Sequence, residues 1–214
     1  PRSSSAASDV YKRQIIDSFG KAFTLPIHKL PSARGQGDPV SSSINSQSGS
    51  TFAGVVAGTE EDYCVLTANN GYGFIAKIEE LQTKNKSGKT ALNTKGAIPL
   101  GPEKLSSIED SYIAAITEEG KMLLIEANDL PVLAKGRGNK IINIDKKKFE
   151  AKENRLIFLK TLNKGDNLKI YSGKQSYMIK SKDLENFVGS RGRKGNFLPK
   201  GYRRVDKLEV ISEE

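Results

Sequence analysis

Residues 63–78 read Tyr-Cys-Val-Leu-Thr-Ala-Asn-Asn-Gly-Tyr-Gly-Phe-Ile-Ala-Lys-Ile, which is two β-prone runs on either side of an Asn-Asn-Gly turn. β-Branched, aromatic and small apolar residues around such a turn predict an antiparallel hairpin. A polar connection with Leu81 follows, and then the basic, glycine-containing segment 84–89. We expect this loop to lead into another short strand and so to complete one structural unit.

The same order of features occurs four times along the chain. The turn glycines at positions 20, 71, 120 and 173 are 51, 49 and 53 residues apart, and a leucine follows each glycine after ten or eleven residues. A period near 50 residues with several short strands per unit predicts a radial array of blades and not a single globule. The expected fold class is therefore all-β, with about four propeller-like blades.

The composition excludes several kinds of site. The 214 residues include one cysteine, Cys64, and one histidine, His28. An internal disulfide, a multi-cysteine zinc site and a paired-histidine metal site are therefore excluded. Most nucleophile–base pairs are excluded as well, because they need a histidine beside the serine or cysteine. We expect Cys64 to be a core residue of a strand and His28 to be structural.

The formal net charge of +9 is distributed unevenly. Residues 1–14 carry a net charge of +2, and residues 15–131 carry 10 basic against 14 acidic side chains, a net of −4. Residues 132–214 carry 21 basic against 10 acidic side chains, a net of +11. A cationic surface on one part of a compact chain predicts a polyanionic partner such as nucleic acid.

Two stretches differ from the repeats. Residues 1–14 are rich in serine and alanine and lack apolar periodicity. We interpret them as a non-native, disordered leader, and residues 15–214 as the folded domain, which would then start part-way round a ring of blades. Residues 145–154 contain three consecutive lysines and are expected to form an exposed linker between blades.

A basic, glycine-containing loop recurs at the same point of each unit, at residues 34–37, 84–89, 135–140 and 191–195. Glycine permits tight turns and close backbone approach, and lysine and arginine supply charge for phosphates. Loops in register would form a basic stripe along one rim of the blades, onto which a bent DNA duplex could fit. The candidate phosphate contacts are Arg34, Lys84, Lys86, Lys89, Lys135, Arg137, Lys140, Arg191, Arg193, Lys194, Arg203 and Arg204.

Three other patterns do not carry a function. Residues 71–76 match a dinucleotide-binding pattern, but they open a β run, so no helix N-terminus is available for a pyrophosphate. Residues 88–90 resemble the end of a P-loop, but Thr83 stands where the first glycine is required. The carboxylates at 60–62 and 118–119 lie in turns without the spacing of a metal site.

Five segments resemble the C-terminal domain of the A subunit of bacterial DNA topoisomerase IV. They are residues 30–37, 71–74, 129–131, 135–144 and 189–195. The resemblance covers essentially all of residues 15–211, and residues 135–144 are its most specific part. It implies a β-pinwheel, in which blades exchange strands and the rim binds and bends DNA.

The resemblance also implies a larger enzyme. The family's holoenzyme is an A2B2 assembly, in which two A subunits and two B subunits pass one duplex through another, using ATP and magnesium. The family's catalytic tyrosine follows an arginine, and none of the seven tyrosines here does. We therefore expect this chain to be non-catalytic, to hold no cofactor or metal of its own, to be cytoplasmic and nucleoid-associated, and to have no membrane span.

Two alternatives remain open. The related A subunit of DNA gyrase carries a similar domain that wraps DNA, and the choice of topoisomerase IV depends on the loop sequences and on the ending at residues 201–207. A propeller-type scaffold for protein interactions uses the same blade architecture without nucleic acid. Basic residues in every loop favour DNA, because a neutral scaffold needs the turns but not the charges.

Overall fold

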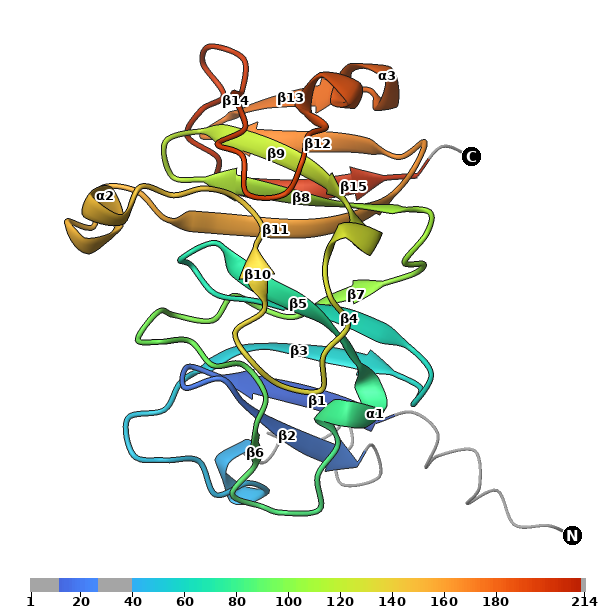
Figure 1. Ribbon diagram of the computed structural model, residues 1–214, viewed down its shortest axis with the longest axis vertical. Coiled ribbons are helices and arrows are strands. Elements are labelled where there is room, and N and C mark those ends of the chain that lie inside the picture. Colours follow the sequence, from blue (N-terminus) through green and yellow to red (C-terminus); the bar gives the residue numbers. More distant parts are fainter. Residues whose placement is uncertain (1–11, 27–39, 213–214) are drawn as a thin grey trace, which may run out of the picture.

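The structure, a computed structural model, describes residues 12–26 and 40–212. Within these residues the chain forms four antiparallel β-sheets, which are stacked one above another in chain order (Figure 1). We number them blade 1 to blade 4. The all-β architecture of about four blades that the repeats predicted is confirmed.

Blade 1 contains, in spatial order, β3 (Phe52–Gly58), β1 (Lys12–Asp17), β2 (Lys21–Pro26) and β6 (Lys89–Thr90). Blade 2 contains β10 (Asn139–Lys140), β5 (Tyr72–Lys77), β4 (Tyr63–Thr67) and β7 (Glu103–Leu105). Blade 3 contains β11 (Leu156–Asn163), β8 (Ser111–Thr117), β9 (Lys121–Glu126) and β14 (Asn196–Phe197). Blade 4 contains β13 (Gln175–Ile179), β12 (Asn167–Ser172) and β15 (Lys207–Ile211).

The first three blades each receive one strand from the following unit. β6 follows the β4–β5 hairpin in the sequence but pairs with β2; β10 likewise pairs with β5, and β14 with β9. At the opposite edges, β3, β7, β11 and β15 contact one another in turn, so we call this side the hub edge. We call the side formed by β6, β10 and β14 the outer edge.

The hydrophobic cores lie between neighbouring blades. Phe74 and Ile75 are adjacent in β5 and fully buried, but Phe74 packs toward blade 1 with Ile16, whereas Ile75 packs toward blade 3 with Ile113. Blades 3 and 4 pack through a third cluster that includes Leu124. A sheet covered on both faces is apolar at successive positions, which explains the continuous apolar runs of the middle blades.

Blade 4 has the pattern of an end blade. Leu168 and Ile170 of β12 are buried against blade 3, whereas Lys169 and Tyr171 between and after them lie on the uncovered face. This alternation is typical of a sheet with one solvated side, and a polar outer face is typical of a terminal repeat. Among the described residues, no strand pairs with the free edge of β13.

The fourth hairpin also has a different turn. In the first three hairpins the turn glycine is the last residue before the second strand, at Gly20, Gly71 and Gly120. Gly173 is instead the first residue of a two-residue turn, since Ser172 pairs with Gln175. Gly173 is therefore not equivalent to the other turn glycines. The last residue of this turn is Lys174, which explains why eleven residues and not ten separate Gly173 from Leu184.

Short helical turns follow the second strand of the later hairpins. They are α1 (Ile78–Leu81), η3 (Ala127–Asp129) and α3 (Ser181–Leu184), the last continued by η4 (Glu185–Phe187); η2 (Val40–Ser42) precedes β3. Leu81, Leu130 and Leu184 are buried. The repeated leucine in the sequence therefore fixes these turns against the cores.

The linker expected at residues 145–154 contains a helical turn, α2 (Lys146–Glu150). The Asp145 carboxylate caps this turn by accepting hydrogen bonds from the backbone N–H groups of Lys147 and Lys148, at 2.9 and 3.2 Å. A side-chain acceptor at this position is the standard helix start. The stretch does connect blade 2 to blade 3, but it is not wholly irregular.

The boundary expected at residue 15 is three residues late. β1 begins at Lys12, and Gln14 is buried, with its Oε1 accepting a 2.8 Å hydrogen bond from the Thr24 hydroxyl. Residues 12–14 therefore belong to blade 1 and not to a leader. Residues 1–11, together with His28, lie outside the described part.

Cys64 is a core residue, as the sequence predicted, and its side chain is buried in β4. Burial raises the pKa of its thiol to about 12. Because the thiolate is the reactive form, we expect no labelling by a disulfide reagent in the native protein at about pH 8 and one thiol per chain after denaturation. Labelling of the native protein at the rate of a free thiol would contradict this burial.

No helix in the described residues is long and apolar enough to span a bilayer.

Candidate nucleic-acid interface

The basic loops that the structure describes lie on the same edge of the stack. Residues 84–89, 135–140 and 191–195 lead into β6, β10 and β14, which lie one above another along the outer edge (Figure 1). The register that the sequence predicted is therefore present for three of the four loops. The fourth, residues 34–37 with Arg34, lies outside the described residues.

A glycine immediately precedes each invading strand, at Gly88, Gly138 and Gly195, and each has a positive φ of 70–76°. A Cβ on Gly138 would lie 1.9 Å from the carbonyl oxygen of Gly73, and one on Gly195 would lie 2.5 Å from that of Met122. Only glycine avoids both the left-handed strain and the collision. These glycines therefore place each basic loop directly on the backbone of its host blade.

Backbone hydrogen bonds join each basic loop to an asparagine of the preceding unit. The N–H of Asn93 donates to Gly136 O at 2.7 Å, and the N–H of Asn143 donates to Arg193 O at 2.8 Å. Asn45 N–H makes the corresponding 2.7 Å bond to Lys86 O. The three loops are thus held at fixed positions relative to one another, as one continuous surface.

The candidate cations on this surface are not paired with carboxylates. The ten salt bridges among the described residues use other cations, namely Lys12, Lys77, Lys104, Lys121, Lys146, Lys148, Arg155, Lys160 and Lys164. None of the eleven described candidates from Lys84 to Arg204 makes one. Nine of the eleven are exposed, while Lys89 and Lys140 are half-buried. Their charge therefore remains available to a ligand.

Several of these side chains are oriented by local contacts. The Cζ of Arg137 lies 3.7 Å from the centroid of the Tyr72 ring, and the Nζ of Lys140 lies 5.7 Å from it. Arg191 donates from Nη1 to Lys140 O at 3.1 Å, which joins the loops of blades 2 and 3. Arg203 donates from Nε to the Leu198 carbonyl oxygen at 3.3 Å.

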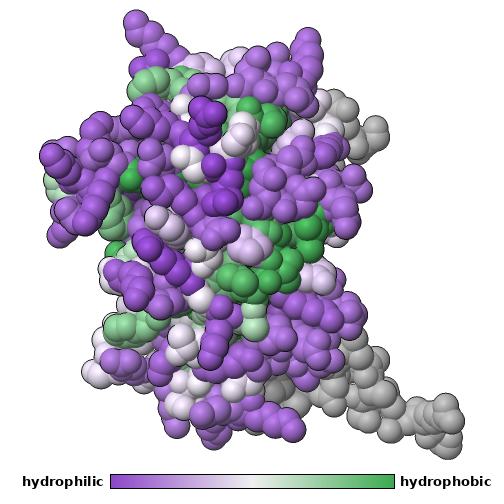
Figure 2. Space-filling view, viewed as in Figure 1, coloured by the Kyte–Doolittle hydropathy of each residue, from purple (hydrophilic) through white to green (hydrophobic). Residues whose placement is uncertain are grey.

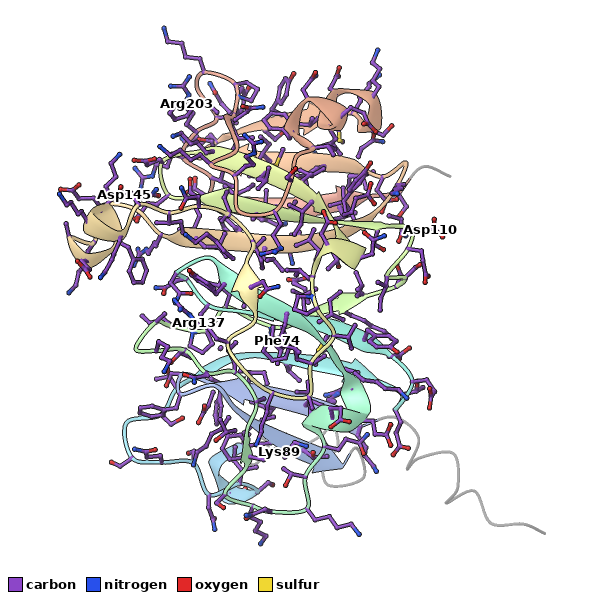
Figure 3. The ribbon with its side chains drawn as sticks, in the orientation of Figure 1. Phe74, Lys89, Asp110, Arg137, Asp145 and Arg203 are labelled. Atoms are coloured by element: carbon purple, nitrogen blue, oxygen red, sulfur yellow. The ribbon has the colours of Figure 1, made fainter. Side chains whose placement is uncertain are left out.

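Figure 3 shows Arg203, Arg137 and Lys89 at three successive heights of the stack. Arg203 and Arg204 follow β14, and the backbone of Arg203 lies against the turn glycine Gly120 of blade 3. The face toward the viewer is mostly hydrophilic, with an apolar area near mid-height on one side (Figure 2). The stripe therefore extends across the first three blades and includes residues from the fourth unit.

Carboxylates gather at the strand ends opposite the hairpin turns. Glu79 and Glu80 lie in α1, Asp129 ends η3, and Asp183 lies in α3. Asp110 precedes β8 at the same end, on the side away from Arg137 and Arg203 (Figure 3). Lysines lie at this end as well, where Lys77 pairs with Glu79 and Lys164 with Glu126. Asp145 lies on the same side as Arg137 and Arg203 (Figure 3), so acidic and basic groups are only partly separated.

Glu119 is a carboxylate close to the upper part of the stripe. It forms ion pairs with Lys148 and Lys121, and the hydrogen bond from Lys148 lowers the pKa of its carboxyl. Within the described residues, no group of three or more histidine, cysteine or acidic side chains could hold a metal ion. The arrangement can bind an extended anion.

Comparison with known proteins identifies the family. Residues 62–97 and 111–150 match the family model described as the DNA gyrase C-terminal domain, beta-propeller. The structure superposes on the Escherichia coli ParC C-terminal domain with a TM-score of 0.85 and 30% identity, covering 96% of this chain and 83% of that one. The chain belongs to the ParC C-terminal domain family.

Curated relatives agree with this assignment. The chain is 42% identical over 196 residues to the A subunit of DNA topoisomerase 4 from Pseudomonas aeruginosa and 39% identical over 197 residues to that from Haemophilus influenzae. These matches cover 91% and 92% of the chain and 26% of each relative, so this ParC-type domain spans about a quarter of their length. A gyrase A C-terminal domain shares the fold, with a TM-score of 0.71 at 12% identity over 95% of this chain and 65% of that one.

Sequence reasoning missed two kinds of residue in this ParC-type domain. The aromatic rings of Tyr72 and Phe197 lie beneath cations of the stripe. Asn45, Asn93 and Asn143 each follow a buried aliphatic residue and join two units. The repeated Ile-Asn or Leu-Asn pair was a usable signal for the asparagines. Arg137 meets Tyr72 only across strands from different units, whereas Arg203 and Phe197 belong to the same unit.

Proposed function

We propose that this domain binds duplex DNA along its outer edge and presents it, bent around the blades, to the rest of a type IIA topoisomerase. The observation that carries the proposal is the row of unpaired cations on three interlocked loops. Among the described residues, no candidate cation has a carboxylate partner, although nine other cations form salt bridges. Exposed unpaired charge in register matches a regularly spaced row of phosphates.

The domain contributes binding and bending, and the chemistry lies elsewhere. Strand cleavage and ATP hydrolysis would be performed by other parts of an assembly that contains two copies of each kind of subunit, with ATP and magnesium bound outside the described residues. Contacts to the backbone phosphates give little sequence preference, so bending would depend on DNA deformability. In the cell, this role places the protein in the cytoplasm on the chromosome.

Duplex binding measured against salt concentration tests the proposal. With 6–10 phosphate contacts, we expect fluorescence anisotropy on a short labelled duplex to show affinity falling by roughly 10³–10⁵ between 50 and 200 mM salt. Duplexes of unrelated sequence should bind alike. An affinity that does not change with salt, or the capture of a protein partner without any duplex binding, would favour the scaffold function instead.

The change in linking number of a plasmid separates the two related activities. A gyrase-type domain wraps DNA chirally and shifts the linking number strongly, whereas a topoisomerase IV-type domain bends it weakly. The higher similarity to the ParC domain predicts the weak effect. A large shift of one sign would assign the wrapping activity.

A further inference from the structure

The aromatic residues under the stripe occur at matching positions of two blades. In blade 2, Lys140 of the invading strand is paired in register with Tyr72 of the host strand. In blade 3, Phe197 of the invading strand is paired with Lys121 of the host strand. The same position between invader and host thus combines one ring and one lysine in both blades, with the roles exchanged.

A second cation lies over each ring. Arg137 is 3.7 Å from the Tyr72 centroid, and Arg203 is 4.3 Å from the Phe197 centroid. The paired lysines are close to the same rings, with Lys140 Nζ at 5.7 Å and Lys121 Nζ at 4.8 Å. These distances are within the range in which a ring face attracts a cation.

Ring stacking leaves the phosphate-binding groups of arginine free. A guanidinium that lies over a ring uses its flat face, so that the N–H donors in its plane still point outward. Arg137 lies between Gly136 and Gly138, which both have positive φ angles. Its side chain lies over the ring of Tyr72, a contact that restricts its conformation. The ring supplies that restriction before the ligand arrives.

Blade 1 lacks this arrangement. Its corresponding pair is Lys21 with Thr90, so no ring lies at that position. Among the described residues, the cations of this loop, Lys84, Lys86 and Lys89, do not lie over any ring. The stripe is therefore ordered in blades 2 and 3 and less restricted in blade 1.

We propose that Tyr72 and Phe197 are positioning residues, which hold Arg137 and Arg203 in the conformation that contacts DNA phosphates. The proposal rests on the proposed function and adds to it that blades 2 and 3 grip the duplex more tightly than blade 1. The rings themselves need not touch the DNA. Their effect on binding passes through the arginines, because pre-ordering lowers the entropy lost on binding.

Variants that remove each ring at constant charge test this inference. We expect Tyr72→Leu and Phe197→Leu each to weaken duplex binding about threefold to tenfold, in line with the strength of a cation–ring contact. Tyr72→Phe and Phe197→Tyr keep the ring and should retain wild-type affinity. Urea unfolding of every variant shows whether the domain remains folded under the binding conditions.

A double-mutant cycle identifies the route of the effect. In a background that carries both Arg137→Ala and Lys140→Ala, Tyr72→Leu should cause no further loss of affinity, since the ring then has no cation of the stripe to hold. The same holds for Phe197→Leu in an Arg203→Ala background. A loss that persists in these backgrounds would show that the ring contacts DNA directly and would overturn the positioning role.

The two proposals fail in different ways. Wild-type protein that does not bind duplex DNA overturns the proposed function and this inference with it. Wild-type protein that binds, while both leucine variants bind equally well, overturns the inference alone. Folded Tyr72→Phe and Phe197→Tyr variants that bind as weakly as the leucine variants would likewise contradict a role for the ring face.

Discussion

Replacing Arg191, Arg193 and Lys194 together by alanine is expected to lower duplex affinity by roughly two to three orders of magnitude at about 0.1 M salt. The three side chains are exposed and have no carboxylate partner among the described residues. Each phosphate contact that is lost also lowers the salt slope by about 0.9. The slope should therefore fall by about 2.7, which anisotropy titrations at several salt concentrations would measure.

A matched variant separates the stripe from the overall charge. Lys169, Lys180 and Lys182 belong to the same unit, and their replacement by alanine removes the same total charge. Lys169 lies on the uncovered face of β12, while the other two lie just before and within α3. We expect only a small change in affinity from this control. Equal losses in both variants would mean that net charge alone, and not the outer edge, determines binding.

The position of the 191–195 loop explains why it should dominate. Gly192 N–H donates to Ile141 O at 2.8 Å, and Arg193 O accepts from Asn143. Arg191 also donates to Lys140 O. This loop therefore extends the 135–140 loop into a single basic surface, located in the part of the chain that carries the +11 charge.

The hairpins and the period could be predicted because each is a local feature. The runs on either side of Gly71 and Gly120 contain enough β-prone residues to indicate two strands and a turn. A short strand after each basic loop was predicted, but its pairing with the preceding blade was not. β6, β10 and β14 contain two residues each and show no periodicity that would indicate a partner. The prediction that blades exchange strands depended on the family resemblance.

The turn of the fourth unit shows where repeat counting fails. Gly173 follows Gly120 by a spacing close to the period, but it occupies a different position in a shorter turn. Spacing alone does not distinguish the end of a three-residue turn from the start of a two-residue turn. The alternation of Leu168, Lys169 and Ile170 was a better local signal, because it indicates that one face of this blade is solvated.

The candidate site was predictable in position but not in detail. Glycine and basic residues in four segments indicated a common edge, which is observed for the three described loops. The ring under Arg137 belongs to Tyr72, a residue of another unit. Sequence reasoning placed Tyr72 in a hairpin, in a rejected motif and in a segment of the family resemblance, but not beneath a cation. Contacts that depend on strand exchange become visible only when the pairing is known.

Gly73, one of the glycines in the rejected dinucleotide-like pattern at residues 71–76, lies against the invading strand β10. A substitution at this contact is expected to have the second large effect. Gly73 pairs with Asn139, next to Gly138, and a Cβ on Gly138 would lie 1.9 Å from Gly73 O and 2.3 Å from its carbonyl carbon. We expect Gly138→Ala to destabilise the domain by about 2–5 kcal/mol, from left-handed strain and from overpacking. Urea unfolding at neutral pH would measure the loss.

Gly49→Ala is the control for the backbone strain. Gly49 has a φ of +79°, close to the +76° of Gly138, but no atom lies within 4 Å of its Cβ position. Gly49→Ala should therefore lower the free energy of unfolding by only about 1–2 kcal/mol. The Gly138 variant should in addition lose duplex affinity while still folded, because displacement of β10 moves Arg137 and Lys140 off the outer edge. If the two variants lose equal stability and Gly138→Ala binds DNA normally, the close seating of the invading strand does not hold the basic loop in place.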